Sequence, residues 1–93
     1  MSVTASPLVL LTRPECGLCE EMSRALAALA RRVPLPALIV RDVDEDALLS
    51  RRYGLKIPVL LLDGQAVCAG QLDEPQLLRA LRDHALRAGL DRL

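Results

Sequence analysis

Continuous apolar runs alternate along the chain with segments whose apolar residues are three or four positions apart. Residues 8–11 form one such continuous run, which is typical of a strand that is buried on both faces. From position 17 the apolar residues recur at helical spacing. Pro34 stops this second pattern, because proline cannot continue a helix. The N-terminal part therefore predicts a strand followed by a helix whose inward face carries Leu18, Met22, Leu26, Leu29 and Val33.

A second strand and a short helix are predicted next. The apolar residues within 37–43 predict a strand that runs parallel to the first, because the helix between the two is long enough for a crossover. Asp44 or Asp46 is placed to cap the short helix that follows. Gly54 stands where a C′ glycine would end it.

The last part predicts a hairpin and a helix. Asp63-Gly64 follows the apolar run 58–62, and this dipeptide is favoured in type I′ turns because both of its residues need a positive φ. Asp73 has the spacing of a helix cap, and Gly89 is expected to close the helix that it opens.

These elements have the order βαβαββα, which predicts an α/β fold with a mixed sheet and helices on both faces. A chain of 93 residues is expected to form a single domain over 1–93. We expect its packed core to span about residues 7–88, with residues 89–93 as a frayed tail of a monomer.

Composition excludes several function classes. The hydrophobic fraction is 52%, which is enough for a packed core, and the charged fraction is 26%. Twelve basic residues balance twelve acidic ones, and Tyr53 is the single aromatic residue of the sequence. A neutral chain with almost no stacking side chains is not expected to bind nucleic acid.

The hydropathy pattern predicts no membrane segment. The longest apolar runs are four to six residues, whereas a membrane helix needs about 20. The N-terminal residues show no basic segment followed by a long apolar stretch, so no secretory signal is predicted. We expect a cytoplasmic protein that has no membrane partner.

Cysteine usage gives the main indication of chemistry. Cys16 and Cys19 form a CxxC, and Cys68 makes the count odd, which disfavours a framework of structural disulfides. Cys16 lies between the first strand and the first helix, where the free N–H groups of the helix favour its thiolate. Cys19 lies one turn further along the same helix and is expected to be more buried. This pair is suited to attack a disulfide and to resolve the product.

Several ordered motifs make the chain resemble the glutaredoxins of the thioredoxin superfamily, and most closely the bacterial glutaredoxin-like proteins of undefined substrate. These motifs are Cys16-Gly17-Leu18-Cys19 after the first strand, Ile57-Pro58 at the start of the third, and Gly70 with Asp73 before the last helix. The resemblance implies a thioredoxin fold whose four-stranded sheet has the strand order 2-1-3-4.

The resemblance also implies a set of contacts. Pro58 would be cis and face the CxxC, and the backbone of Ile57 would pair with an extended substrate. Arg13 would meet a glutathione carboxylate, and Asp73 would face the γ-glutamyl amine. The residues that the resemblance places against substrate or glutathione are Arg13, Gly17, Leu18, Ile57, Pro58, Gly70, Gln71 and Asp73.

The leading functional hypothesis is a thiol–disulfide oxidoreductase in which Cys16 attacks and Cys19 resolves. Its clients would be protein disulfides or mixed disulfides with glutathione, and an external thiol would restore the dithiol. No cofactor is expected within the chain, and glutathione is a candidate co-substrate.

Two other functions remain open. One is an interaction module with little turnover, because the carboxylates around the motif (Glu15, Glu20 and Glu21) oppose thiolate formation. The other is a glutathione-dependent carrier of iron–sulfur clusters, since a small residue, Gly17, follows Cys16 as in some glutaredoxins. Cys68 and His84 complete a zinc ligand set only on paper, so no metal site is predicted, and Cys68 is expected to be a small strand residue.

Overall fold

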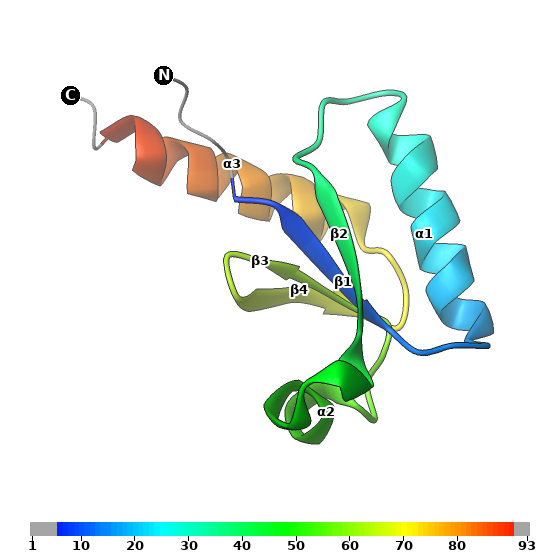
Figure 1. Cartoon of the computed structure of the whole chain (residues 1–93). Helices are drawn as coiled ribbons and strands as arrows, with labels where there is room; N and C mark the ends of the chain where they lie inside the picture. Colours follow the sequence, from blue (N-terminus) through cyan, green and yellow to red (C-terminus); the bar gives the residue numbers. More distant parts are fainter. Residues whose placement is uncertain (1–5, 91–93) are drawn as a thin grey trace.

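The computed structural model describes residues 6–90 (Figure 1). The elements follow the predicted order with one additional 3-10 helix, η1. They are β1 (Leu8–Thr12), α1 (Gly17–Ala30), β2 (Leu38–Asp42), η1 (Val43–Glu45), α2 (Ala47–Tyr53), β3 (Val59–Leu62), β4 (Gln65–Ala69) and α3 (Glu74–Leu90).

The four strands form one mixed sheet in the order β2-β1-β3-β4, as predicted. The central strand β1 runs parallel to β2 and antiparallel to β3, and β4 continues the sheet as a hairpin partner of β3. In this register Leu11 of β1 lies opposite Val59 of β3. The C-terminal end of β1 and the N-terminal end of β3 therefore lie side by side at one end of the strands.

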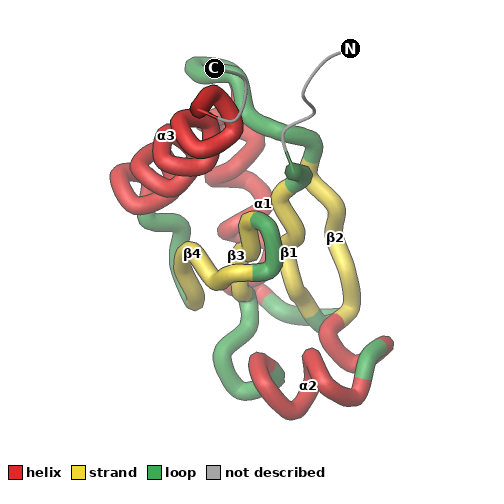
Figure 2. The backbone as a smooth tube through the Cα atoms, turned by 90° about the vertical axis from the view of Figure 1, so that its left-hand side faces the viewer, coloured by secondary structure: helices red, strands yellow, loops and turns green. Residues whose placement is uncertain are grey.

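Helices cover both faces of the sheet, as predicted. Leu8, Leu10 and Leu60 pack on one face with buried residues of α1 and with Leu77 of α3. Leu11 packs on the other face with Val59, Leu61 and Val43, beneath residues of α2. Figure 2 shows the strands between α3 at one end and α2 at the other. The apolar run of β1 thus alternates between two cores, which is why it is uninterrupted.

The predicted inward position of Leu18 is wrong. Leu18 is 49% exposed, because Cys19 takes the inward position of the first turn and is followed there by Met22. The residues of β2 that precede Asp42 are exposed. Its first three residues are apolar although β2 lies at the edge of the sheet, where only one side has a neighbour among the described residues.

The two predicted helix ends differ from the structure in different ways: α2 ends before Gly54 as predicted but without the expected conformation, whereas α3 does not end at Gly89. Gly54 follows α2 with a φ of −56°, so it is not a left-handed C′ residue. Gly89 lies within α3, which continues to Leu90. Glycine lowers the stability of a helix but does not forbid it, so the helix can continue through this position. Residues 91–93 of the predicted tail are outside the described part of the chain.

The predicted hairpin turn and the predicted N-caps of α2 and α3 are confirmed. Asp63 and Gly64 have φ angles of 53° and 79°, as a type I′ turn requires. The Asp46 carboxylate accepts hydrogen bonds from two backbone N–H groups at the start of α2, and Asp73 Oδ1 accepts one from Gln76 at the start of α3. Within residues 6–90, no helix is both long and apolar enough to cross a bilayer.

Candidate functional site

Cys16 and Cys19 form a disulfide at the start of α1. Cys16 is the N-cap of the helix, with extended backbone angles, and its Sγ accepts a hydrogen bond from the backbone N–H of Cys19 at 3.1 Å. The loop from Arg13 to Glu15 leads from the central strand to this cap and includes Glu15 with a φ of 58°. The first sulfur therefore faces the positive end of the helix, as expected.

The two cysteines differ in exposure. Cys16 is half-buried, whereas Cys19 is only 4% exposed and belongs to the buried side of α1. This confirms the prediction that Cys19 is the more buried of the two. An incoming disulfide can approach the sulfur of Cys16, while that of Cys19 is shielded by the protein.

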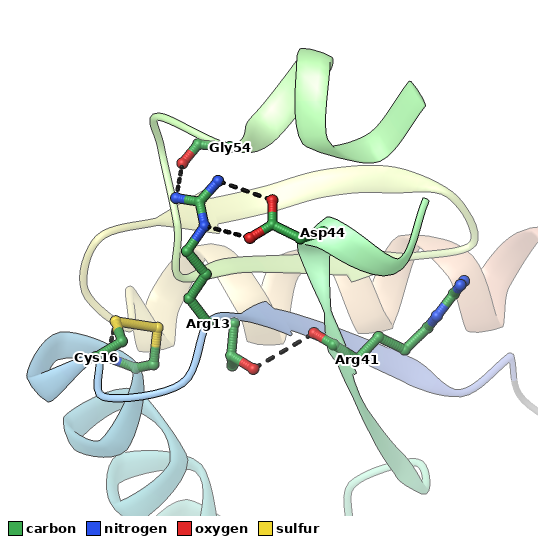
Figure 3. The surroundings of a disulfide bond; sticks show 7 residues. Arg13, Cys16, Arg41, Asp44 and Gly54 are labelled. Atoms are coloured by element: carbon green, nitrogen blue, oxygen red, sulfur yellow. Dashed lines mark hydrogen bonds and ion pairs between the residues drawn. A yellow bond between two sulfur atoms is a disulfide. The ribbon is translucent and has the colours of Figure 1, made fainter. Parts of the chain in front are cut away.

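Arg13 lies beside the disulfide but is held by the opposite side of the site (Figure 3). Its Nε and Nη2 donate to the two carboxylate oxygens of Asp44 at 2.7 and 3.1 Å. Its Nη1 donates to the carbonyl of Gly54 at 2.7 Å. The first loop is thereby joined to η1 and to the residue that follows α2. Five guanidinium N–H donors exist, so these three bonds leave two for a ligand.

This pair shifts the ionisation of both of its members. The hydrogen bond from Arg13 lowers the pKa of Asp44 below the ordinary value, with a further bond from Ser50 Oγ. The hydrogen bond to Asp44 raises the already high pKa of Arg13. Both side chains are about a third to a half exposed, so solvent screens their attraction.

Gly54 allows this arrangement by its size. A Cβ built on Gly54 would meet the carbonyl oxygen of Ser50, and it would lie 2.9 Å from Nη2 of Arg13. The sequence pattern did not reveal Asp44 or Gly54 as partners of Arg13, because they are 31 and 41 residues away along the chain. Only the parallel pairing of β1 with β2 brings Thr12 next to Asp42 and so makes the contact possible.

The Ile57–Pro58 peptide bond is cis, as the resemblance implies. It directly precedes β3, at the end of the sheet where β1 finishes. The loop that carries the cysteines leaves the sheet at this same end. Gly70, with a φ of 83°, donates its backbone N–H to the carbonyl of Pro58 at 2.8 Å. The structure thus joins Pro58 to Gly70. Gly17, Leu18 and Gln71 have exposed side chains or backbone.

Asp73 already has a structural use, because its carboxylate caps α3 through Gln76 N–H at 3.0 Å. A capping carboxylate retains a free oxygen, so this contact leaves room for a ligand amine.

Cys68 is a half-buried free thiol on β4 that packs against the main core. Burial raises its pKa, in keeping with the predicted role as a small strand residue. His84 lies 3.4 Å from Ser6 Oγ and 3.9 Å from Asp63 Oδ2. Across residues 6–90 there is no group of three or more His, Cys, Asp or Glu side chains arranged to hold a metal ion.

The ion pair gives a pH-dependent prediction for Asp44→Asn. Because the pKa of Asp44 is lowered in the folded state, its carboxylate stabilises the fold at pH values above the ordinary aspartate pKa of about 3.9. This stabilisation is lost as the pH falls through the lowered pKa. The urea midpoint of Asp44→Asn should therefore be below that of the unaltered protein at pH 7, and the two should converge in acid. A constant difference at every pH would contradict this assignment.

A mixed sheet of this order defines a thioredoxin fold, and here a cis-proline lies at the end of the sheet where a CxxC disulfide caps the first helix. The Glutaredoxin-like domain (DUF836) family matches residues 7–82. The chain therefore belongs to this glutaredoxin-like family.

Solved structures agree with this assignment. The protein Ne2328 from Nitrosomonas europaea is 29% identical, covers 86% of this chain and 95% of its own, and has a TM-score of 0.74. The protein XcR50 from X. campestris is 34% identical over 92% of this chain and 97% of its own, with a TM-score of 0.58. Thioredoxin from Fasciola hepatica shares the fold at 22% identity and a TM-score of 0.52, over 86% of this chain and 81% of its own. The search of curated proteins found no match.

Proposed function

We propose that this protein is a thiol–disulfide oxidoreductase that reduces disulfides of protein clients or mixed disulfides with glutathione. The observation that carries the proposal is the unequal exposure of two bonded cysteines at a helix N-terminus. Cys16 is half-buried and accepts an N–H bond, and Cys19 is 4% exposed. One sulfur is accessible and stabilised as a thiolate, and the other is positioned to act only after the first has reacted.

In the reduced protein, the Cys16 thiolate attacks one sulfur of the client disulfide. A mixed disulfide forms, and the other client sulfur leaves as a thiolate that takes up a proton. The Cys19 thiol then loses its proton and attacks Sγ of Cys16, which releases the second client thiolate and forms the Cys16–Cys19 disulfide. The client gains two electrons and two protons. An external dithiol, or two molecules of glutathione, returns them to the protein.

Glutathione is included because Arg13, at the site, keeps two guanidinium N–H donors beyond those that bind Asp44 and Gly54. A carboxylate of glutathione would use them, and Asp73 would accept from the γ-glutamyl amine. In the same complex, the backbone of Ile57 would pair with the extended part of the substrate.

Reduction of the oxidised protein tests the proposal. The protein is incubated either with glutathione or with thioredoxin, thioredoxin reductase and NADPH, and its free thiols are alkylated and counted by mass. We expect two new thiols, on Cys16 and Cys19, with Cys68 unchanged. The reduced protein should then lose those two thiols when it reduces bis(2-hydroxyethyl) disulfide. If neither system restores the dithiol, an interaction module with little turnover replaces this proposal.

Reactivity of the reduced protein provides the second readout. We expect iodoacetamide to modify Cys16 faster than Cys19 at pH 7, because the helix N-terminus favours the Cys16 thiolate and burial protects Cys19. Faster modification of Cys19 would reverse the assignment of nucleophile and resolving thiol.

A further inference from the structure

The edge strand β2 exposes apolar side chains on both faces of the sheet. Leu38, Ile39 and Val40 are 39, 44 and 56% exposed. Successive side chains of a strand point to opposite faces, so Leu38 and Val40 share one face and Ile39 lies on the other. A helix packed on one face would leave the other face uncovered. A further strand, added along the edge, would cover both faces.

The backbone of β2 is arranged to accept such a strand. The carbonyl of Ala37 accepts from Leu8 N–H at 2.9 Å, and that of Arg41 faces Thr12, whose Oγ1 lies 3.4 Å away (Figure 3). Backbone groups of a strand alternate in direction, so those of Leu38 and Val40 point away from β1. Among residues 6–90, no strand lies on that side.

The β2 strand borders the surface hollow that contains Cys16 and Cys19. Val40 lines a hollow of about 480 Å³ together with Cys16, Cys19 and Arg24. Leu38, on the same face, lines a neighbouring hollow of about 260 Å³ between β2 and α1. Ser23 of α1 borders both hollows. The second hollow is almost wholly apolar, and its other lining residues are Leu8, Leu26, Ala27, Ala30, Leu35 and Pro36.

We propose that the free edge of β2 binds an extended segment of the client polypeptide as a fifth strand and so presents the client disulfide to Cys16. Apolar side chains at alternate positions of the client segment would lie over Leu38 and Val40. This inference rests on the proposed function and adds the class of client, a disulfide in or beside an extended apolar segment. The occupant is a client and not a second copy of the chain, because the hollow that Val40 lines also contains Cys16 and Cys19, so a strand on this edge lies beside the sulfur that attacks the client.

Val40→Pro tests whether the outward N–H of Val40 binds the client strand. Proline removes the N–H that points away from β1, and an edge strand tolerates proline when its N–H faces solvent. Val40→Thr is the matched control, since threonine keeps both the N–H and a β-branched side chain. Both changes keep the two cysteines and the backbone groups that pair β2 with β1, and both alter the same side chain in the hollow beside Cys16.

Two synthetic peptides serve as probes of the client segment. The first alternates valine and threonine over six residues and ends in a cysteine held as a mixed disulfide with 2-mercaptoethanol. The second is identical but is N-methylated at alternate residues on the edge that would face β2. The small disulfide bis(2-hydroxyethyl) disulfide is the reference substrate, because it has no backbone to pair.

We expect kcat/KM for the first peptide to fall about tenfold on N-methylation and about tenfold in Val40→Pro, since each change removes hydrogen bonds of the added strand. Val40→Thr should keep the higher value, and for each protein the peptide rate is expressed relative to its own rate with the small disulfide, because Val40 lines the hollow that contains Cys16. Should Val40→Pro fail to fold, the two peptides still give the comparison with the unaltered protein.

Equal rates for both peptides, with the small disulfide still reduced, would overturn the docking site and leave the proposed function intact. If no disulfide is reduced, the proposed function fails, and docking is judged by fluorescence anisotropy with a labelled peptide in which serine replaces cysteine. Binding that N-methylation abolishes would then support the site, and absent binding would overturn it. A dimer in sedimentation that Val40→Pro dissociates would also overturn it, because a second copy would occupy the edge.

Discussion

Replacing Cys16 with serine is expected to reduce disulfide exchange to the uncatalysed rate, whereas Cys19→Ser should stop the reaction at a mixed disulfide. A serine hydroxyl at position 16 supplies no thiolate, so the first attack does not occur. In Cys19→Ser the accessible thiolate remains, but the buried thiol that would release the client is absent. Mass spectrometry after incubation with oxidised glutathione should show one glutathione on Cys19→Ser and almost none on Cys16→Ser.

Cys68→Ser is the control for this pair. Cys68 is half-buried, and burial raises the pKa of its thiol, so it should neither trap glutathione rapidly nor alter turnover. Trapping on Cys16→Ser instead would mean that Cys19 is the nucleophile. A protein that is trapped on Cys19→Ser as a mixed disulfide would also identify the client directly.

Leu60→Ala is expected to destabilise the protein by about 2 to 5 kcal/mol, which is a large share of the stability of a small domain. Leu60 has no exposed surface and lies in the third strand, opposite Leu10 on one side and Cys68 on the other. It belongs to the core cluster that includes residues of α1 and α3. Its truncation therefore leaves a cavity where the sheet meets both helices. Urea denaturation at pH 7 measures the loss.

Leu48→Ala is the matched control, because Leu48 is the same residue type and is 73% exposed on α2. We expect its unfolding free energy to stay within about 0.5 kcal/mol of the original value. Equal losses for the two variants would show that Leu60 does not occupy the core.

Much of the fold could be predicted because its signals are local. The uninterrupted apolar run of β1 reflects burial against two cores, and the Asp63-Gly64 dipeptide fixes the hairpin. The caps Asp46 and Asp73 mark the starts of α2 and α3. Cys16 and Cys19 were identified in the same way, since their chemistry depends on spacing and on the boundary between a strand and a helix.

What could not be predicted depends on contacts between distant segments. The apolar residues of β2 look like those of a buried strand, and hydropathy does not reveal that β2 lies at the edge of the sheet. The engagement of Arg13 with Asp44 depends on which strand lies beside β1. The helical spacing predicts Leu18 inward because it lies four residues before Met22, whereas the structure buries Cys19, three residues before Met22.

The contact at Gly54 also constrains how the family can vary. Arg13, Asp44 and Gly54 come from separate segments, yet the guanidinium reaches the Gly54 carbonyl only where no side chain occupies the adjoining space. A relative with alanine at the Gly54 position would displace the arginine, and the acidic partner would then lose its counter-charge. We expect the three positions to covary in an alignment of this family, so that substitution at one accompanies substitution at the others.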